Sequence, residues 1–104
     1  MAEQPPEHAF TAIDEQLDPS SWIGVLDAVR KEPVYAAYKA RIAELLRPTR
    51  RGRYLEVGVG TGADALELAS RFEVEVVGVD VSRTMVEEAR RRGLQAAQIG
   101  RAHV

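Results

Sequence analysis

Cysteine is missing altogether from this 104-residue sequence, and aromatic residues make up only 6% of it. Without thiols the chain forms no disulfide, no thiolate nucleophile and no zinc–thiolate site. Its formal net charge of −2 argues against the basic surface of a general nucleic-acid binder. No apolar run approaches the ~20 residues that cross a bilayer, and the opening MAEQPPEHAF lacks the features of a signal peptide. We therefore expect a cytoplasmic protein that binds neither nucleic acid nor membrane.

Metal binding is not expected either, because the two histidines, His8 and His103, have no neighbours at ligand-like spacing. What the sequence does have is the composition of an ordinary globular unit, with 45% apolar and 29% charged residues. Residues 1–19 include three prolines and no sustained period, so we expect most of them to form a mobile lead that adds little to the core, with a helical turn around Ala12 to Gln16. The oligomeric state cannot be inferred from these features.

A helical extension is expected over residues 20–52. Trp22, Val25, Leu26 and Val29 follow the spacing of one helix face behind a cap at Ser20 or Ser21. A second helix starts at Pro33 and ends before Pro48, with one apolar face that comprises Tyr35, Tyr38, Ile42, Leu45 and Leu46. The basic turn RPTRRGR that follows is interpreted as a solvated loop.

Residues 53–98 show a different pattern, in which short β-rich runs alternate with helical ones. RYLEV and EVEVVGVD are typical of strands, and LQAAQI looks like the beginning of a third. The helix between the second and third strands is capped by Ser82 and stopped by Gly93, with Met85, Val86 and Ala89 facing inward. The predicted fold class is α/β, a partial Rossmann-like parallel sheet of two to three strands behind an N-terminal helical extension.

The glycine loop after the first strand is the main functional signal. Gly58, Gly60 and Gly62 leave bare backbone that can approach a ligand, and the positive end of the following helix faces the same point. Asp80 ends the second strand about 20 residues later, where its carboxylate can accept hydrogen bonds from both hydroxyls of a ribose. The spacing predicts a ligand that carries a nucleoside.

Glu56 discriminates between the possible ligands that carry a nucleoside. Gly58, Gly60 and Ala63 also satisfy the dinucleotide pattern G-x-G-x-x-G/A. An anionic side chain beside the loop would repel a pyrophosphate by roughly 1 kcal/mol or more, and it would attract a ligand with sulfonium and ammonium groups. An NAD(P)-dependent oxidoreductase is the disfavoured alternative. A non-catalytic module that binds such a cationic nucleoside ligand or a partner is a third.

The segment LEVGVGTG resembles the first motif of class I S-adenosylmethionine-dependent methyltransferases, written [DE]-x-G-x-G-x-G, and VVGVDVSRTMVEEARRR resembles their ribose-binding segment. The helical lead is similar to that of small bacterial enzymes of the ubiquinone/menaquinone methyltransferase type. The resemblance implies the cofactor S-adenosyl-L-methionine and methyl transfer to a small-molecule acceptor. It places the methionine moiety against Glu56, Gly58, Gly60 and Gly62. The resemblance also places the ribose against Asp80 and the adenine near Val81 and Met85.

The resemblance covers only the cofactor half of such an enzyme. The later strands, the acid that binds the adenine amino group and the acceptor pocket would all follow the last residue, so no catalytic residue is assigned. Residues 99–104 resemble the translation of a common sequencing-library adapter, ATC GGA AGA GCA CAC GTC. We expect native sequence only to about Gln98, and hence an inactive fragment. Tyr35, Tyr38 and Lys39 point toward the cofactor in one interpretation; core or surface roles are favoured instead.

Overall fold

The computed structural model describes residues 9–100, and the side chains from residue 12 onward. The predictions for the first eight and last four residues lie outside this range. They concern His8, His103 and most of the expected adapter tail. In chain order the elements are η1 (Ala9–Glu15), a 3₁₀ helix, α1 (Ser21–Arg30), α2 (Pro33–Leu46), β1 (Arg53–Val57), α3 (Ala63–Phe72), β2 (Glu75–Asp80), α4 (Arg83–Arg91) and β3 (Gln95–Gln98). The described part is therefore mixed α/β.

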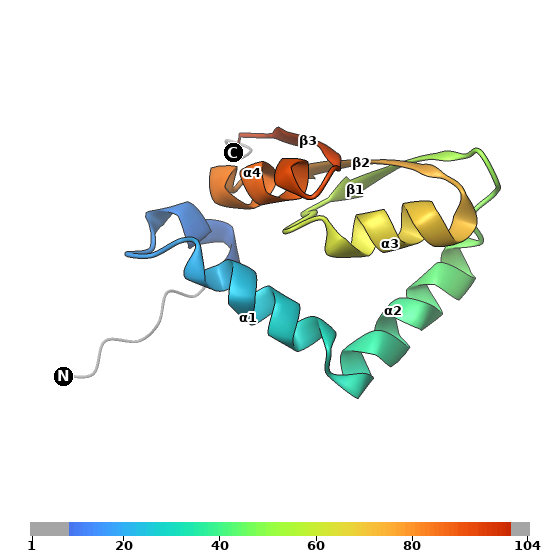
Figure 1. Ribbon diagram of the computed structural model, residues 1–104, viewed down its shortest axis with the longest axis horizontal. Helices are drawn as coiled ribbons and strands as arrows, with labels where there is room; N and C mark the ends of the chain where they lie inside the picture. Colours follow the sequence, from blue (N-terminus) through green and yellow to red (C-terminus); the bar gives the residue numbers. More distant parts are fainter. Residues whose placement is uncertain (1–8, 101–104) are drawn as a thin grey trace, which may run out of the picture.

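The three strands form one parallel sheet in the order β1-β2-β3 (Figure 1). Leu55 lies opposite Val77, and Val79 lies opposite Ala97. Each strand therefore pairs with the next strand of the sequence across an intervening helix, as parallel strands require. This arrangement confirms the predicted Rossmann-like class and shows that LQAAQI does contain a third strand.

The core lies between the sheet and the pair of helices α3 and α4. Its buried members are Val59, Ala65, Val74, Val76, Val86, Ala89, Leu94 and Ala96. Gly78 in the middle of β2 is needed for this packing, because a Cβ there would lie 2.5 Å from a methyl carbon of Val59. A glycine inside a strand commonly marks such a close approach. The strand β2 therefore holds the glycine loop tightly against the sheet.

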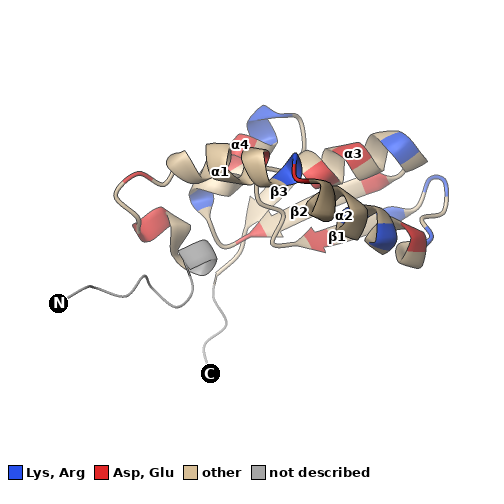
Figure 2. Ribbon diagram, turned by 90° about the horizontal axis from the view of Figure 1, so that it is seen from below, with Lys and Arg blue, Asp and Glu red and all other residues tan. Residues whose placement is uncertain are grey.

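The opposite face of the sheet is open. Figure 2 shows α1, α3 and α4 on one side of the strands. Leu55 and Val57 point to the other side and remain 63% and 70% exposed. Alternate residues of a strand point to opposite faces, which explains why Tyr54 and Glu56 turn toward the helices while these two do not.

The lead differs from the expectation at one position. Ile13 of η1 is buried, although residues 1–19 were predicted to add little to the core. Its neighbour Asp14 accepts hydrogen bonds from the start of α4, so η1 is fixed to the sheet domain across 68 to 70 residues of sequence. The helical turn predicted around Ala12 to Gln16 thus coincides largely with η1, whereas its attachment to α4 was not predicted, because a single carboxylate in a helix cap carries no periodic signal.

Helices α1 and α2 form at the predicted places, but neither contains a buried residue. Val25, Val29, Tyr38 and Leu45, which were expected on inward faces, are exposed. The reason is geometric: α3 and α4 already occupy the covered face of a three-stranded sheet. Helices α1 and α2 therefore lie outside this layer, where α2 borders β1 and α3, and α1 contacts α3 and the C-terminal end of α4.

The ends of α4 agree with the sequence. Ser82 caps the helix by accepting a hydrogen bond from the amide of Met85, and Gly93 follows it with a left-handed φ of 104°. The arginines in its last turn and at its C-cap bind protein groups: Arg90 donates to the carbonyl of Ala96, and Arg92 donates to both carboxylate oxygens of Asp27 on α1. These arginines tie α4 to β3 and to α1.

Candidate functional site

The glycine loop between β1 and α3 has the backbone that its sequence predicts. Gly58, Gly60 and Gly62 all have positive φ, at 72°, 56° and 80°. Residues with a Cβ rarely adopt this conformation. The amides of Gly58 and Val59 both donate to the carbonyl of Val79, which fixes the loop to the end of β2.

The glycines serve two different purposes. A Cβ on Gly62 would lie 3.0 Å from Ala89 and from Leu94, so this position is set by packing of the loop against α4 and its C-terminal turn. A Cβ on Gly58 would meet nothing within 4 Å. Gly58 therefore borders open space, where a ligand can come close to the backbone.

Asp80 is buried at the end of β2, and its carboxylate faces the loop. One oxygen accepts a hydrogen bond of 2.9 Å from the amide of Gly60, and the other accepts one of 2.9 Å from the amide of Ser82. A carboxylate has about four lone-pair sites, so each oxygen can accept a further bond. The predicted pair, the glycine loop and the acid 20 residues later, is thus brought into direct contact.

Beyond Asp80 lies a cavity of about 250 Å³. Val81 and Ser82 line one side of it, Gln98 lines another, and Ala12 and Asp14 of η1 line a third. Val81 therefore borders open space, and its contact with an adenine stays a prediction. Met85 does not line this cavity and has no exposed surface, so the described conformation gives it no access to a ligand there.

Glu56 is half-buried at the C-terminal half of β1, on the same face of the strand as Tyr54. Burial raises the pKa of Glu56, and the charge of Asp64 adds to the rise, whereas Lys39 opposes it. A buried carboxylate with a raised pKa gains from a nearby positive charge. Glu56 therefore supplies a favourable position for a cation next to the glycine loop.

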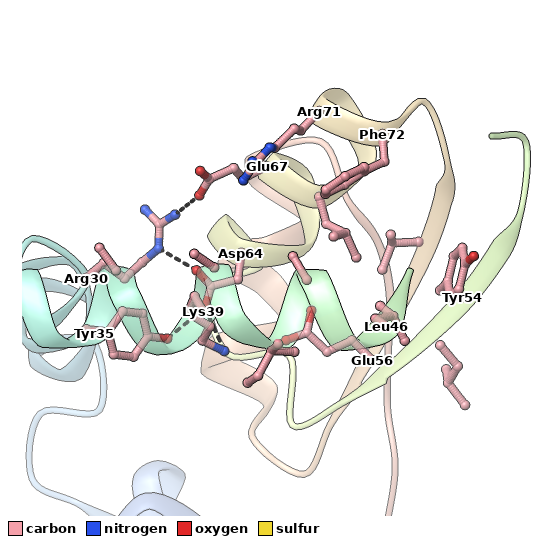
Figure 3. A pocket seen from close by; sticks show the side chains of 17 residues that line it. Arg30, Tyr35, Lys39, Leu46, Tyr54, Glu56, Asp64, Glu67, Arg71 and Phe72 are labelled. Atoms are coloured by element: carbon pink, nitrogen blue, oxygen red, sulfur yellow. Dashed lines mark hydrogen bonds and ion pairs between the residues drawn. The ribbon is translucent and has the colours of Figure 1, made fainter. Parts of the chain in front are cut away.

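A polar cluster around Asp64 joins α1 and α2 to the first turn of α3 (Figure 3). Asp64 accepts hydrogen bonds of 2.9 Å from Arg30 and 2.7 Å from Tyr35, and its carboxylate lies 3.2 Å from the ammonium of Lys39. Burial alone would raise the pKa of Asp64, but these three partners lower it below its usual value. Tyr35 and Lys39 are thus held against Asp64 on α3, while Tyr38 is exposed, and an approach of these residues to the cofactor is not tested by these contacts.

A larger cavity of about 450 Å³ lies between α2, α3 and β1. Its lining includes many apolar side chains, with Leu46, Tyr54 and Phe72 at one end and the Asp64 cluster at the other (Figure 3). Tyr54 and Leu55 both line it although they point to opposite faces of β1, so it reaches the outer edge of that strand. Because no strand of residues 9–100 pairs with that edge, we assign this space to no ligand.

Sequence reasoning missed three contributors to the site. Gly78 was detectable, because a glycine in an otherwise apolar strand signals a close approach. Asp14 and Asp64 had no such signal, since their partners lie far away in the sequence. Within residues 9–100 there is no group of three His, Asp or Glu side chains that could hold a metal ion, and no helix is both long and apolar enough to cross a membrane.

Comparison with known proteins agrees with this geometry. Residues 55–103 match a family described as a methyltransferase domain. An uncharacterized protein of Methanocaldococcus jannaschii is 41% identical over 58 residues, which are 56% of this chain and 26% of that protein. The chain thus spans about a quarter of the length of this relative.

Three solved structures share the fold. Phosphoethanolamine N-methyltransferase 2 of Haemonchus contortus, solved with S-adenosyl-L-methionine, aligns with a TM-score of 0.67 at 24% identity over 86% of this chain and 24% of its own. A protein-L-isoaspartate O-methyltransferase aligns at 0.53 with 26% identity, over 64% of this chain and 23% of its own. The [4+2]-cyclase SpnF aligns with a TM-score of 0.52 at 29% identity, over 64% of this chain and 26% of its own.

The cyclase shows that the fold alone does not fix the reaction. The family match, however, begins inside β1 and includes the glycine loop, Asp80 and α4. The sheet order and the acid that contacts the loop belong to the same region. Residues 55–103 of this chain are therefore similar to a methyltransferase domain, and the chain has the Rossmann-like fold of the methyltransferases with which it aligns.

Proposed function

We propose that this chain binds S-adenosyl-L-methionine and belongs to an enzyme that transfers its methyl group to a small-molecule acceptor. One observation carries the proposal: Asp80 at the end of β2 contacts the amide of Gly60 in a loop of three positive-φ glycines. Ligands of parallel α/β sheets bind at the carboxyl ends of the strands, which is where these groups meet.

Each part of the ligand has a matching group in the site. The free acceptor capacity of Asp80 suits the two ribose hydroxyls, and the cavity beside Val81 suits the adenine ring. The open space at Gly58 leaves room for the methionine part to pass close to the backbone. The residues present thus fit the cofactor in shape and in hydrogen bonding.

Charge favours this ligand over a dinucleotide. Glu56 is half-buried beside the loop, so its ionised carboxylate would stabilise a sulfonium or ammonium group and repel a pyrophosphate, and a bound cation would offset the burial that raises the pKa of Glu56. The Asp64 carboxylate adds a second negative charge to the same region, although Arg30 and Lys39 neutralise it locally. No observation in residues 9–100 favours the oxidoreductase alternative.

When bound, the cofactor supplies a sulfonium methyl group, which passes to a nucleophilic atom of the acceptor while the sulfur becomes a neutral thioether and the acceptor loses a proton. The contribution of this chain is alignment. Asp80 and the glycine loop fix the nucleoside, and Glu56 orients the cationic end. Holding two reactants in line accounts for much of the acceleration in such a displacement. No residue of this chain is assigned to proton removal.

Equilibrium binding tests the proposal. We expect the chain to bind S-adenosylmethionine and S-adenosylhomocysteine, and to bind NAD at least tenfold more weakly. D80N should weaken both sulfur ligands, because an amide offers one acceptor oxygen instead of two. E87Q, which removes a carboxylate from the exposed side of α4, is the matched control. A preference for NAD would refute the proposal and support an oxidoreductase.

A further inference from the structure

The N-terminal segment lies beside the proposed nucleoside site, although it is far from it in the sequence. Asp14 of η1 accepts a hydrogen bond of 2.7 Å from the hydroxyl of Ser82 and one of 3.1 Å from the amide of Thr84, and it also accepts one from the amide of Arg83. These are the first groups of α4, directly after Asp80 and Val81. The start of α4 is therefore already occupied by a carboxylate of the protein.

The contacts continue beyond Ser82. The amide of Ser82 donates to one oxygen of Asp80, and the amide of Gly60 donates to the other. A continuous path of hydrogen bonds thus runs from Asp14 through Ser82 and Asp80 to Gly60. We call these four residues the Asp14 network. It links η1, the start of α4, the end of β2 and the glycine loop.

The same segment also forms part of a cavity. Ala12, Asp14 and Glu15 line the space of about 250 Å³ whose other walls include Val81 and Gln98. Ile13, between them in the sequence, is buried and anchors the segment. The wall opposite Val81 is therefore held in place by one apolar side chain and by the bonds of Asp14.

We propose that η1 is the outer wall of the nucleoside site and that Asp14 is a positioning residue, which sets the orientation of Asp80 through Ser82. The inference rests on the proposed function, because it concerns the same ligand. It adds a contribution from a segment more than 40 residues before the glycine loop. Asp14 acts on the nucleoside end only, since Glu56 and Gly58 are not part of the Asp14 network.

Ligand binding separates this role from a general effect on folding. We expect D14A to weaken binding of adenosine and of S-adenosylhomocysteine by the same factor, about tenfold, at a temperature where circular dichroism shows the variant folded. E56Q should weaken S-adenosylhomocysteine and leave adenosine unchanged, because adenosine has no ammonium group. E87Q should change neither. D14N, which keeps one acceptor oxygen, should restore part of the affinity.

Amide hydrogen exchange tests the Asp14 network without any ligand. D14A should speed exchange at Ser82 and also at Gly60, which lies at the far end of the network. If D14A leaves adenosine affinity and Gly60 exchange as in the unsubstituted chain, the inference is wrong, and Asp14 is only a helix cap. If the unsubstituted chain binds neither ligand, the proposed function fails instead, and the exchange at Gly60 alone decides whether the Asp14 network exists.

Discussion

Replacing Gly62 by alanine tests the packing of the glycine loop most directly. The residue has a φ of 80°, and its new Cβ would lie 3.0 Å from Ala89 and Leu94 in the core between loop and α4. An alanine in the left-handed region costs about 1–2 kcal/mol. Overpacking a tight core adds about 1–3 kcal/mol. We expect G62A to lower the free energy of unfolding by about 3.5 kcal/mol, the sum of the midpoints of these two ranges.

Two other glycines provide controls. Gly58 and Gly93 also have positive φ, at 72° and 104°, but a Cβ on either meets nothing within 4 Å. G58A and G93A should therefore show only the backbone term, about 1–2 kcal/mol. Urea unfolding followed by circular dichroism measures all three variants. With an m-value of about 1–2 kcal/mol/M, G62A should unfold at a urea concentration at least about 1 M lower than either control.

The two loop variants should also differ in ligand binding. G58A places a methyl group in the open space that we assign to the cofactor, so it should weaken S-adenosylhomocysteine more than G62A does in the folded protein. Equal unfolding midpoints for G62A and G58A would refute the packing argument. A G58A variant that binds as well as the unsubstituted chain would show that the open space is not used.

Binding of S-adenosylmethionine should weaken as the pH falls, because the bound cation favours ionised Glu56. The affinity is full above the raised pKa of this carboxyl and is lost below it. Calorimetric titration of E56Q should therefore give weaker binding with a flatter pH dependence. The hydrogen bonds from two arginines lower the pKa of Glu88 from 4.5 to about 2. Its contribution to stability is therefore complete above pH 4.5 and disappears as the pH falls to about 2, and E88Q should unfold in acid with a shallower pH dependence. Y35F should lower the free energy of unfolding by about 1 kcal/mol through loss of its bond to the carboxylate on α3, whereas Y38F, at an exposed tyrosine on the same helix, should have no effect on urea unfolding.

The parts of the fold that the sequence predicts are those with local causes. Strand β1 and the cap of α4 at Ser82 follow from the alternation of apolar residues and from the preference of serine for helix starts. The contact of Asp80 with the glycine loop follows from the topology of parallel strands, which brings their carboxyl ends together.

The parts that could not be predicted depend on side-chain pairs far apart in the sequence. Asp14 and Ser82 are 68 residues apart, and Arg30 and Asp64 are 34 residues apart. A single carboxylate has many possible partners, and hydrophobic spacing says nothing about which one it meets. The exposed faces of α1 and α2 have a related cause, since periodicity identifies an apolar face without showing whether a surface is available to cover it.

The order of the strands has a consequence for how the chain folds. Because β1, β2 and β3 are neighbours in the sheet in the same order as in the sequence, each pairing closes only the loop formed by one intervening helix. Short loop closures are fast, and rates fall as contacts become more distant in the sequence. The sheet can therefore grow strand by strand as the chain leaves the ribosome, starting from β1. Arg30 can bind Asp64 as soon as α3 has formed, before β2 is complete, whereas Asp14 has no partner until the start of α4 exists, so η1 docks later than α1 although it precedes α1 in the sequence.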